Sequence, residues 1–273
     1  MKKRGRPKKD LFEQEVTHVQ IDFSQITKLK DIVIDERMFE QMKSGLALDE
    51  LISHEGGVPS ATNIMLVGDP GIGKTTLLLD LIASVQLNDP TKRCLFISGE
   101  MGKKQMFKYT QRFPQFGMLD TLFVSDFTEH NTKDVMEQLL NTGYDLVLID
   151  SIAEVLDGVR NDNGWDRKTA ESWLVDICVQ NNKGWNENNC FTTFLLIQQV
   201  TKGGVFVGSN KLKHMVDAAA EIRREKESNG GGTYIEFTKN RNGNIENKLY
   251  FQLTGTQIVY SNVEVEEEEE VKD

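Results

Sequence analysis

Residues 68–75 read Gly68-Asp69-Pro70-Gly71-Ile72-Gly73-Lys74-Thr75, and this stretch decides the fold. It fits the pattern G-x-x-x-x-G-K-[ST] without a mismatch, between an apolar segment at Asn63–Val67 and a helix-period segment at Lys74–Gln86. Glycine permits the tight turn that points successive backbone N–H groups at phosphate oxygens, beside a helix N-terminus that favours negative charge. The stretch therefore predicts a nucleotide-binding loop that extends to Thr76; a glycine-rich turn that binds nothing is the weaker alternative.

Apolar segments and helix-period segments alternate on both sides of this loop. Strands are predicted at Asn63–Val67, Cys94–Ser98, Leu122–Asp126, Leu146–Asp150 and Phe191–Gln198. Helices are predicted at Lys74–Gln86, Lys103–Arg112, Lys133–Asn141 and Lys168–Gln180. Near-continuous apolar strands between amphipathic helices predict an α/β fold with a mostly parallel sheet that is covered on both faces.

The end of the chain changes to the two-residue period of half-buried strands. This period holds at Tyr234–Thr238, Lys248–Leu253 and Gln257–Tyr260, and Asn242-Gly243 is a hairpin turn signal between the first two. An antiparallel extension of the sheet is therefore expected.

The loop needs partners for ATP chemistry, and two carboxylates follow predicted strands. Lys74 is expected to reach the β- and γ-phosphates, and the Thr75 hydroxyl to hold Mg²⁺. Asp150 ends a strand of four apolar residues and is the expected second metal-side group, acting largely through water, although a helix-capping role is an alternative. Glu100 follows another strand and is the expected activator of the attacking water, the alternative being a plain surface carboxylate.

Charge is distributed unevenly along the 273 residues, which are 38% hydrophobic and 27% charged. Residues 1–9 carry six positive charges and no negative one, whereas residues 264–273 carry seven negative charges and one positive. The ends cancel, so the body carries the net charge of −10, which argues against DNA bound over the whole surface. The expected division is a basic tail at 1–10, an extension at 11–43, the ATPase domain at 44–262 and an acidic tail at 263–273.

Other compositional signals exclude several classes of protein. No apolar run approaches the ~20 residues of a membrane helix, and no apolar stretch follows the basic N-terminus as in a secretory signal. The three cysteines offer neither a disulfide framework nor a Cys-x-x-Cys zinc site. We therefore expect a cytoplasmic protein without membrane partners, in a bacterial host cell if a phage encodes it.

Together with this loop, further motifs in the same order resemble the RadA/Sms proteins of the RecA superfamily over about residues 44–253. They are Ser44–Leu51, Gly56–Pro59, Ser98–Glu100, Leu148–Ser151, Gln199–Lys202, Leu212–Asp217 and Lys239–Gly243. The resemblance implies a RecA-like fold and a homo-oligomer, hexamer or filament, that hydrolyses ATP between subunits. The chain departs from the RadA/Sms pattern in two ways. It has no four-cysteine zinc module before Cys94, and it has no room for a Lon-like domain after Tyr260. It therefore resembles a stand-alone, phage-type motor core.

The resemblance also implies roles for single residues. Glu100 corresponds to the water-activating glutamate and Gln199 to the γ-phosphate sensor, where RadA has His and DnaB-type helicases have Gln. Lys239 and Arg241 correspond to the pair that reaches the ATP of a neighbouring subunit. Arginine at such an interface offsets charge that develops on the transferred phosphoryl group, although a solvated basic turn is the alternative.

Single-stranded DNA on the axis of the ring or filament would contact two loops, Asp157–Lys168 and Thr201–Lys213. The second loop combines glycines and Phe206 with cations at Lys202, Lys211 and Lys213, which suits backbone pairing and base stacking. The first loop mixes cations with acids, so a solvated loop is an equal alternative there.

The tails suggest further partners. The stretch Arg4-Gly5-Arg6-Pro7 resembles an AT-hook, which lies in the narrow minor groove of A·T-rich duplex, and the alternative is a generic basic tail. The acidic tail is expected to be solvated; the minority alternatives are a DNA mimic that competes for the basic loops and a contact with a replication or recombination partner.

The expected function is thus a DNA-dependent ATPase of recombination, repair or replication. A DnaB-type replicative helicase motor is the alternative, favoured by Gln199. A KaiC-like kinase and a DNA-binding scaffold that does not hydrolyse ATP remain as other classes.

Overall fold

The computed structural model describes residues 26–199, 210–225, 231–245 and 247–261. Contacts divide the chain into residues 1–35 and residues 36–273. The described part of the first unit contains one turn of 3-10 helix at Leu29–Asp31 and buries no side chain there. It exposes five apolar side chains, Ile26, Leu29, Ile32, Val33 and Ile34.

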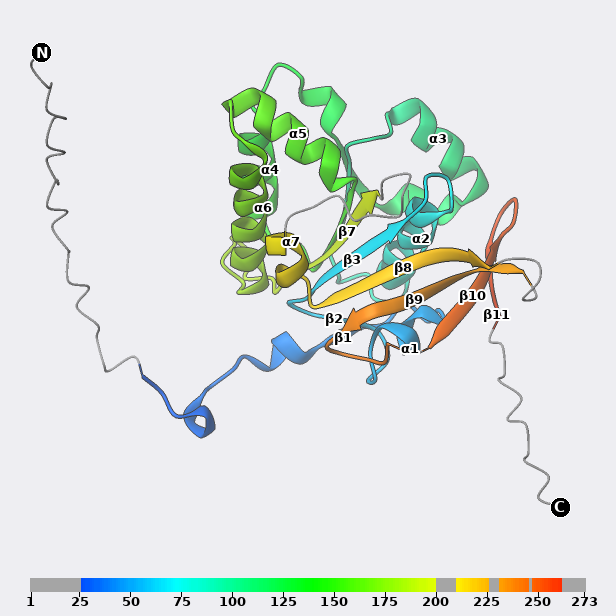
Figure 1. Cartoon of the computed structure of the whole chain (residues 1–273), viewed down its shortest axis with the longest axis horizontal. Helices are drawn as coiled ribbons and strands as arrows, with labels where there is room; N and C mark the ends of the chain where they lie inside the picture. Colours follow the sequence, from blue (N-terminus) through cyan, green and yellow to red (C-terminus); the bar gives the residue numbers. More distant parts are fainter. Residues whose placement is uncertain (1–25, 200–209, 226–230, 246, 262–273) are drawn as a thin grey trace, which may run out of the picture. The chain divides into compact units, whose positions relative to one another are not determined.

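The second unit is built on a nine-stranded sheet with the order β11-β10-β9-β8-β3-β7-β6-β4-β5. Figure 1 labels the part of this sheet from β7 to β11. The strands that pair in parallel are β3 (Asn63–Gly68), β4 (Cys94–Ser98), β5 (Asp120–Phe123), β6 (Leu146–Asp150), β7 (Thr193–Gln199) and β8 (Ala218–Glu225). The antiparallel strands are β9 (Gly232–Asn240), β10 (Lys248–Leu253) and β11 (Ile258–Ser261). A separate two-stranded sheet joins β1 (Gln41–Met42) to β2 (Val58–Pro59).

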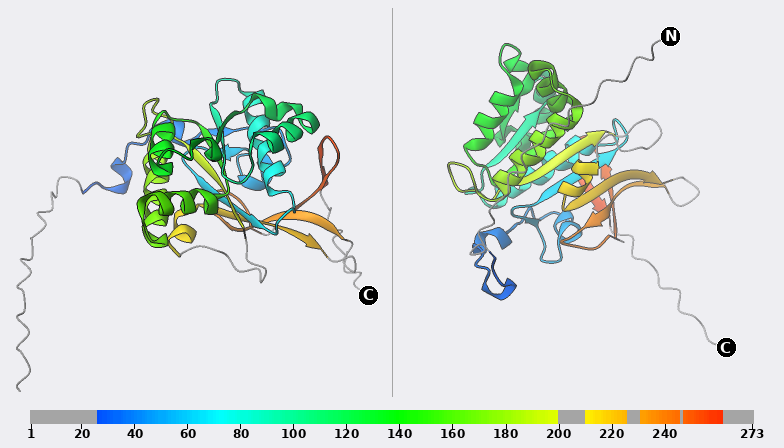
Figure 2. Two further views of the ribbon diagram at one scale, coloured as in Figure 1. Left: turned by 90° about the horizontal axis from the view of Figure 1, so that it is seen from above. Right: turned by 60° about the vertical axis from the view of Figure 1, so that its left-hand side comes forward.

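Helices cover both faces of the sheet, as Figure 2 shows from two further directions. Side chains of α1 (Leu48–Ile52) and α2 (Lys74–Asn88) pack into one core, together with a residue of α3 (Lys103–Arg112). A second core on the other face contains side chains of α4 (Thr132–Asn141), α5 (Ile152–Asn163), α6 (Arg167–Asn182) and α7 (Asn210–Met215). Short 3-10 helices lie at Glu36–Phe39, Pro114–Met118 and Val124–Phe127.

Single strands show why the sequence adopts this arrangement. Leu146 and Leu148 of β6 enter the α2 core, whereas Val147 and Ile149 enter the α4–α6 core. Because neighbouring residues of a strand point to opposite faces, a continuous apolar run fills both cores at once. The predicted α/β class, with a mostly parallel sheet and an antiparallel end, is therefore confirmed.

Three element predictions need correction. The strand predicted at Leu122–Asp126 lies at Asp120–Phe123, and Val124–Phe127 forms a 3-10 helix instead. The expected DNA loop at Asp157–Lys168 is mostly helical, because it spans the end of α5 and the start of α6. Buried Ile152, Val155, Leu156 and Val159 carry the helical period of α5, which the sequence analysis missed.

The third correction is β8, for which no strand was predicted. Its sequence Ala-Ala-Ala-Glu-Ile-Arg-Arg-Glu contains strong helix formers, yet it pairs with β3 on one side and β9 on the other. Ala218, Ala220 and Ile222 are buried in the α2 core, so the tertiary position overrides the intrinsic preference.

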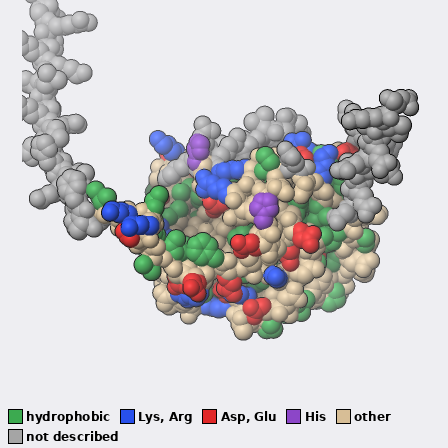
Figure 3. Space-filling model, turned by 90° about the horizontal axis from the view of Figure 1, so that it is seen from below, with side chains coloured by type: hydrophobic (Ala, Val, Ile, Leu, Met, Phe, Trp, Pro, Cys, Tyr) green, Lys and Arg blue, Asp and Glu red, His purple; other side chains and the backbone are tan. Residues whose placement is uncertain are grey.

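No helix among the described residues combines the length and apolar character needed to cross a bilayer. On the face drawn in Figure 3, positive and negative side chains are interspersed rather than gathered by sign.

Candidate functional site

The predicted loop joins the carboxyl end of β3 to the N-terminus of α2. Gly71 and Gly73 have φ values of +74° and +110°, a left-handed conformation that glycine adopts without a steric cost. Helix α2 is 15 residues long and begins at Lys74, directly after the loop. Its free backbone N–H groups therefore open onto the loop, where a phosphate group would be stabilised.

Lys74 is buried and held by the loop itself. Its Nζ atom donates hydrogen bonds to the backbone oxygens of Gly68 and Asp69, at 2.8 and 2.9 Å. Burial lowers the pKa of Lys74, while the nearby Asp150, Glu100 and Asp69 carboxylates oppose this shift. A cation held in this way is set to bind an anion in the cavity next to it.

Thr75 and Asp150 form the predicted metal-side pair. The Thr75 hydroxyl donates a hydrogen bond to Oδ2 of Asp150 over 2.6 Å, although 75 positions of sequence separate them. Asp150 is 2% exposed, and burial raises its pKa to about 6. One hydroxyl and one carboxylate are hard oxygen donors of the kind that Mg²⁺ prefers, so Thr75 and Asp150 would suit this ion. The ion would neutralise phosphate charge there.

Glu100 is attached to the same strand end through the backbone. The N–H groups of Gly99 and Glu100 both donate to the Asp150 carbonyl oxygen, at 2.7 and 3.3 Å. The Ser98 hydroxyl donates to the Met101 carbonyl oxygen at 2.7 Å and closes the turn after β4. These contacts explain why Glu100 lines the same cavity as Lys74 and Asp150.

That cavity has a volume of about 370 Å³ and adds residues that the sequence analysis missed. Its further lining includes Tyr109 and Arg112 of α3 and Leu253 at the end of β10. Arg112 donates to the carbonyl oxygens of Thr254 and Gly255, which fixes α3 to the turn between β10 and β11. Nothing local in the sequence could reveal this wall, because its parts are more than 140 positions apart.

Lys239 and Arg241 lie at the other end of the sheet. Asn240 is opposite Ala218 in β8, and Ala218 is opposite Ile64 at the start of β3. The phosphate-binding loop begins at the far end of β3, which spans six residues or about 20 Å. These two cations are therefore separated by the length of the strand from the loop of their own chain.

Both cations have partners within the chain. Arg241 forms an ion pair with Asp217 at 2.8 Å, and its side chain is 61% exposed. Lys239 donates a hydrogen bond to the Val216 carbonyl oxygen. Asp217 is another residue whose position the sequence analysis did not predict, and its carboxylate also accepts from the backbone N–H of Asn63.

The remaining predicted residues are described only in part. Gln199 ends β7 with its backbone opposite Gly68, and its side chain lies outside the described structure. Lys211 and Lys213 belong to α7, again without described side chains, while Lys202 lies outside the described residues. The same holds for the AT-hook-like stretch Arg4–Pro7 and for the acidic tail.

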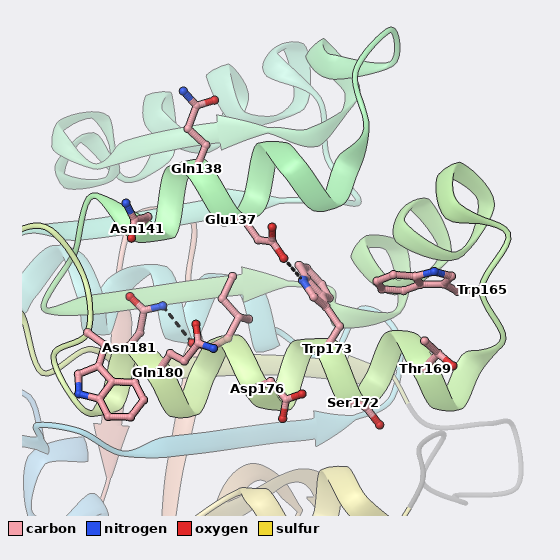
Figure 4. Close-up of a pocket in the computed structure, with 12 residues that line it drawn as sticks. Glu137, Gln138, Asn141, Trp165, Thr169, Ser172, Trp173, Asp176, Gln180 and Asn181 are labelled. Atoms are coloured by element: carbon pink, nitrogen blue, oxygen red, sulfur yellow. Dashed lines mark hydrogen bonds between the residues drawn. The ribbon is translucent and has the colours of Figure 1, made fainter.

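A separate groove of about 720 Å³ lies between α4 and α6 (Figure 4). Trp173 of α6 reaches across to α4, where its Nε1 atom donates to Oε1 of Glu137 at 2.7 Å. Trp173 is only 8% exposed, so this indole packs one helix against the other. The groove shares no lining residue with the phosphate cavity.

Comparisons with known proteins agree with this geometry. Residues 43–205 match the AAA domain family. DNA repair protein RadA of Listeria monocytogenes is 32% identical over 207 residues, covering 75% of this chain and 42% of that protein. RadA of Streptococcus pyogenes is 29% identical over 241 residues, covering 86% and 48%. The chain thus spans less than half the length of these relatives.

Solved structures show the same fold at low identity. A KaiC-like protein of Pyrococcus horikoshii superimposes with a TM-score of 0.60 at 18% identity, covering 82% of this chain and 99% of that one. The flagellar accessory protein FlaH of Methanocaldococcus jannaschii gives 0.61 at 12% identity, covering 82% and 100%. The phosphate-binding loop, the hydrogen bond from Thr75 to the buried Asp150 and these matches together show that the chain belongs to the AAA domain family and is a P-loop ATPase of the RecA superfamily.

Proposed function

We propose that this protein is a RadA-like ATP hydrolase that works between subunits of a homo-oligomer bound to single-stranded DNA. The observation that carries the proposal is the separation of the cations Lys239 and Arg241 from the loop of their own chain by the length of β3. A site that needs both parts can be completed only by a second copy. A hexameric ring or a filament supplies such copies in a repeating head-to-tail arrangement.

In this proposal each residue of the cavity has one task in ATP hydrolysis. Lys74 and the loop backbone bind the β- and γ-phosphates, and Thr75 with Asp150 holds Mg²⁺. Glu100 orients the attacking water and accepts its proton, while Gln199 senses the γ-phosphate. Arg241 and Lys239 of the neighbour offset the charge on the transferred phosphoryl group, after Arg241 has exchanged Asp217 for phosphate.

The DNA component is supported by the name of the relatives, DNA repair protein RadA. It is also supported by the segment Thr201–Lys213, which follows β7 at the same end of the sheet as the phosphate-binding loop. In this proposal Lys202, shortly after β7, binds the DNA backbone at that end, and Lys211 and Lys213 bind it from α7, which ends just before β8 begins beside the start of β3. Recombination, repair and replication all present such single strands, and a DnaB-type helicase motor would use the same parts.

We further propose a duplex contact through Arg4, Gly5, Arg6 and Pro7, in A·T-rich minor grooves. Deletion of residues 2–9 should weaken binding to A·T-rich duplex more than to G·C-rich duplex, while ATP turnover without DNA stays unchanged. We also propose that the acidic tail can contact a replication or recombination partner. The proposed location is the cytoplasm, which is that of the bacterial host if a phage encodes the chain.

Phosphate release with and without a single-stranded oligonucleotide tests the main proposal. We expect stimulation by single strands and little by blunt duplex. Nucleotide binding without turnover would instead indicate a scaffold, and transfer of labelled phosphate to the protein would indicate a KaiC-like kinase. If single strands stimulate turnover, a strand-displacement assay on a forked duplex then distinguishes a helicase, which displaces the strand, from a recombinase.

A further inference from the structure

Helix α3 carries positive charge within the acidic body of the protein, between the basic and the acidic tail. Its ten residues include four cations and no carboxylate. They are Lys103, Lys104, Lys108 and Arg112. Two of these lysines lie in the first turn, where the helix dipole disfavours a positive charge. Lys103 has a compensating ion pair with Asp126, whereas no such contact among the described residues offsets the cost at Lys104, which points to a use for its charge.

The cations that remain available share one face of the helix. Lys103 pairs with Asp126 at 2.7 Å, and Arg112 holds the turn after β10. Lys104 and Lys108 are exposed, and neither has a hydrogen-bond or ion-pair partner in the described part of the chain. Phe107 lies between them in sequence and is 64% exposed. Positions three and four apart are neighbours on a helix, so these three side chains form one basic and aromatic face.

We propose that the acidic C-terminal segment Glu264–Glu270 of the same chain binds this face of α3. Charge complementarity supports this occupant, since the segment contains six glutamates and no cation. Val265 belongs to the segment and Val271 directly follows it, and these two side chains would supply apolar surface for Phe107. The rest of the body is acidic and would repel the segment.

The place where the described chain ends makes the contact reachable. It ends at Ser261, the last residue of β11, and β11 begins directly after the turn that Arg112 holds against α3. From Ser261 along β11 and α3 to Lys104 is a path of about 30 Å. Glu270 is nine residues after Ser261 and can extend to about 30 Å from it, so the last glutamates of the segment can reach both lysines.

Such a contact would shield α3 from other polyanions, including DNA. Because the contact is electrostatic, it would also restrain α3 in a salt-dependent way. Tyr109 and Arg112 of this helix line the phosphate cavity. The inference goes beyond the proposed function and does not depend on it, because the contact needs neither ATP nor DNA.

Zero-length carbodiimide coupling on the full chain tests it directly, because the reagent joins a lysine amine only to a carboxylate in contact. At 50 mM salt we expect peptides that link Lys104 or Lys108 to Glu264–Glu270. The yield should fall severalfold at 500 mM salt, where charges are screened within a few ångströms. In a mixture of heavy-isotope and normal protein, the linked pairs should carry one isotope only. Mixed pairs, or equal coupling to the exposed Lys28, Lys30 and Lys43, would overturn the proposal.

A mutant cycle supplies a second readout in the full chain. Neutralising the six glutamates to glutamine should strengthen binding of a single-stranded oligonucleotide at least threefold, and this gain should disappear in the variant Lys104→Gln/Lys108→Gln. It should persist in the matched control Lys28→Gln/Lys30→Gln. An equal gain in both lysine backgrounds would show that the tail acts elsewhere. Absent coupling, together with weaker oligonucleotide binding in Lys104→Gln/Lys108→Gln, would assign α3 to DNA instead.

Discussion

At the scale of single residues, the phosphate cavity depends on a buried cation whose described hydrogen bonds go to backbone oxygens of its own loop. We expect Lys74→Ala to lose ATP turnover at least ~100-fold, because the β/γ-phosphate charge loses its counter-cation. Its melting temperature without nucleotide should not fall, since burial of Lys74 is itself unfavourable. Phosphate release and thermal melting measure the two effects. The exposed control Lys43→Ala should match the wild type, and wild-type turnover in Lys74→Ala would contradict the assignment.

A variant of Glu100 should lose ATP hydrolysis but keep ATP binding. We expect Glu100→Gln to bind ATP normally and to hydrolyse it about 100-fold more slowly, because the amide keeps the shape of the side chain but cannot accept the proton of water. Titration with a fluorescent ATP analogue measures binding, and single-turnover phosphate release measures chemistry. Glu129→Gln, at an exposed position, is the matched control. Equal loss of affinity and turnover would make Glu100 a structural residue.

At the scale of elements, α2 contains a carboxyl group, that of Asp80, which has no role in the proposed ATP hydrolysis. Asp80 is 8% exposed and accepts a hydrogen bond from Nε2 of Gln115 at 3.1 Å. Burial raises its pKa above the ordinary value of 3.8, while the hydrogen bond opposes the shift. The folded protein thus keeps this proton to a higher pH than the unfolded chain does. The contribution of Asp80 to the free energy of unfolding therefore decreases as the pH rises above about 4.

The variant Asp80→Asn removes that titration but keeps the shape of the side chain. We expect its melting temperature, relative to the wild type, to be higher at pH 7 than at pH 4. Melting curves across this range measure the difference. If the difference does not change with pH, or changes in the opposite direction, Asp80 is not the buried acid described here.

At the scale of the whole molecule, the phosphate-binding loop and the proposed catalytic cations Lys239 and Arg241 lie at opposite ends of one sheet. Arg241→Ala and Lys74→Ala should each be nearly inactive alone, because arginine at such a site contributes ~10³–10⁵ in rate. Mixed in equal amounts, they should recover roughly a quarter of wild-type turnover, since about a quarter of head-to-tail interfaces pair an intact loop with an intact Arg241. Phosphate release at fixed total protein measures the recovery. An inactive mixture with demonstrated co-assembly would return Arg241 to its own subunit.

What the sequence alone determined is local in character. The phosphate-binding loop could be predicted because its glycines, Lys74 and Thr75 are consecutive, and the place of Asp150 because a buried strand ends there. The alternation of strands and helices predicted the fold class, since continuous apolar strands need cover on both faces.

Tertiary structure alone decided the rest. An alanine-rich segment became β8 because its backbone pairs with β3 and β9 while Ala218, Ala220 and Ile222 enter the core under α2, and no local preference indicates this. The tertiary structure also brought Arg112 to the turn after β10. It placed Arg241 about the length of a strand from the phosphate-binding loop of the same chain. Distances of this kind depend on strand order and register. Those are set by the packing of segments far apart in sequence, and neither periodicity nor motif spacing contains them.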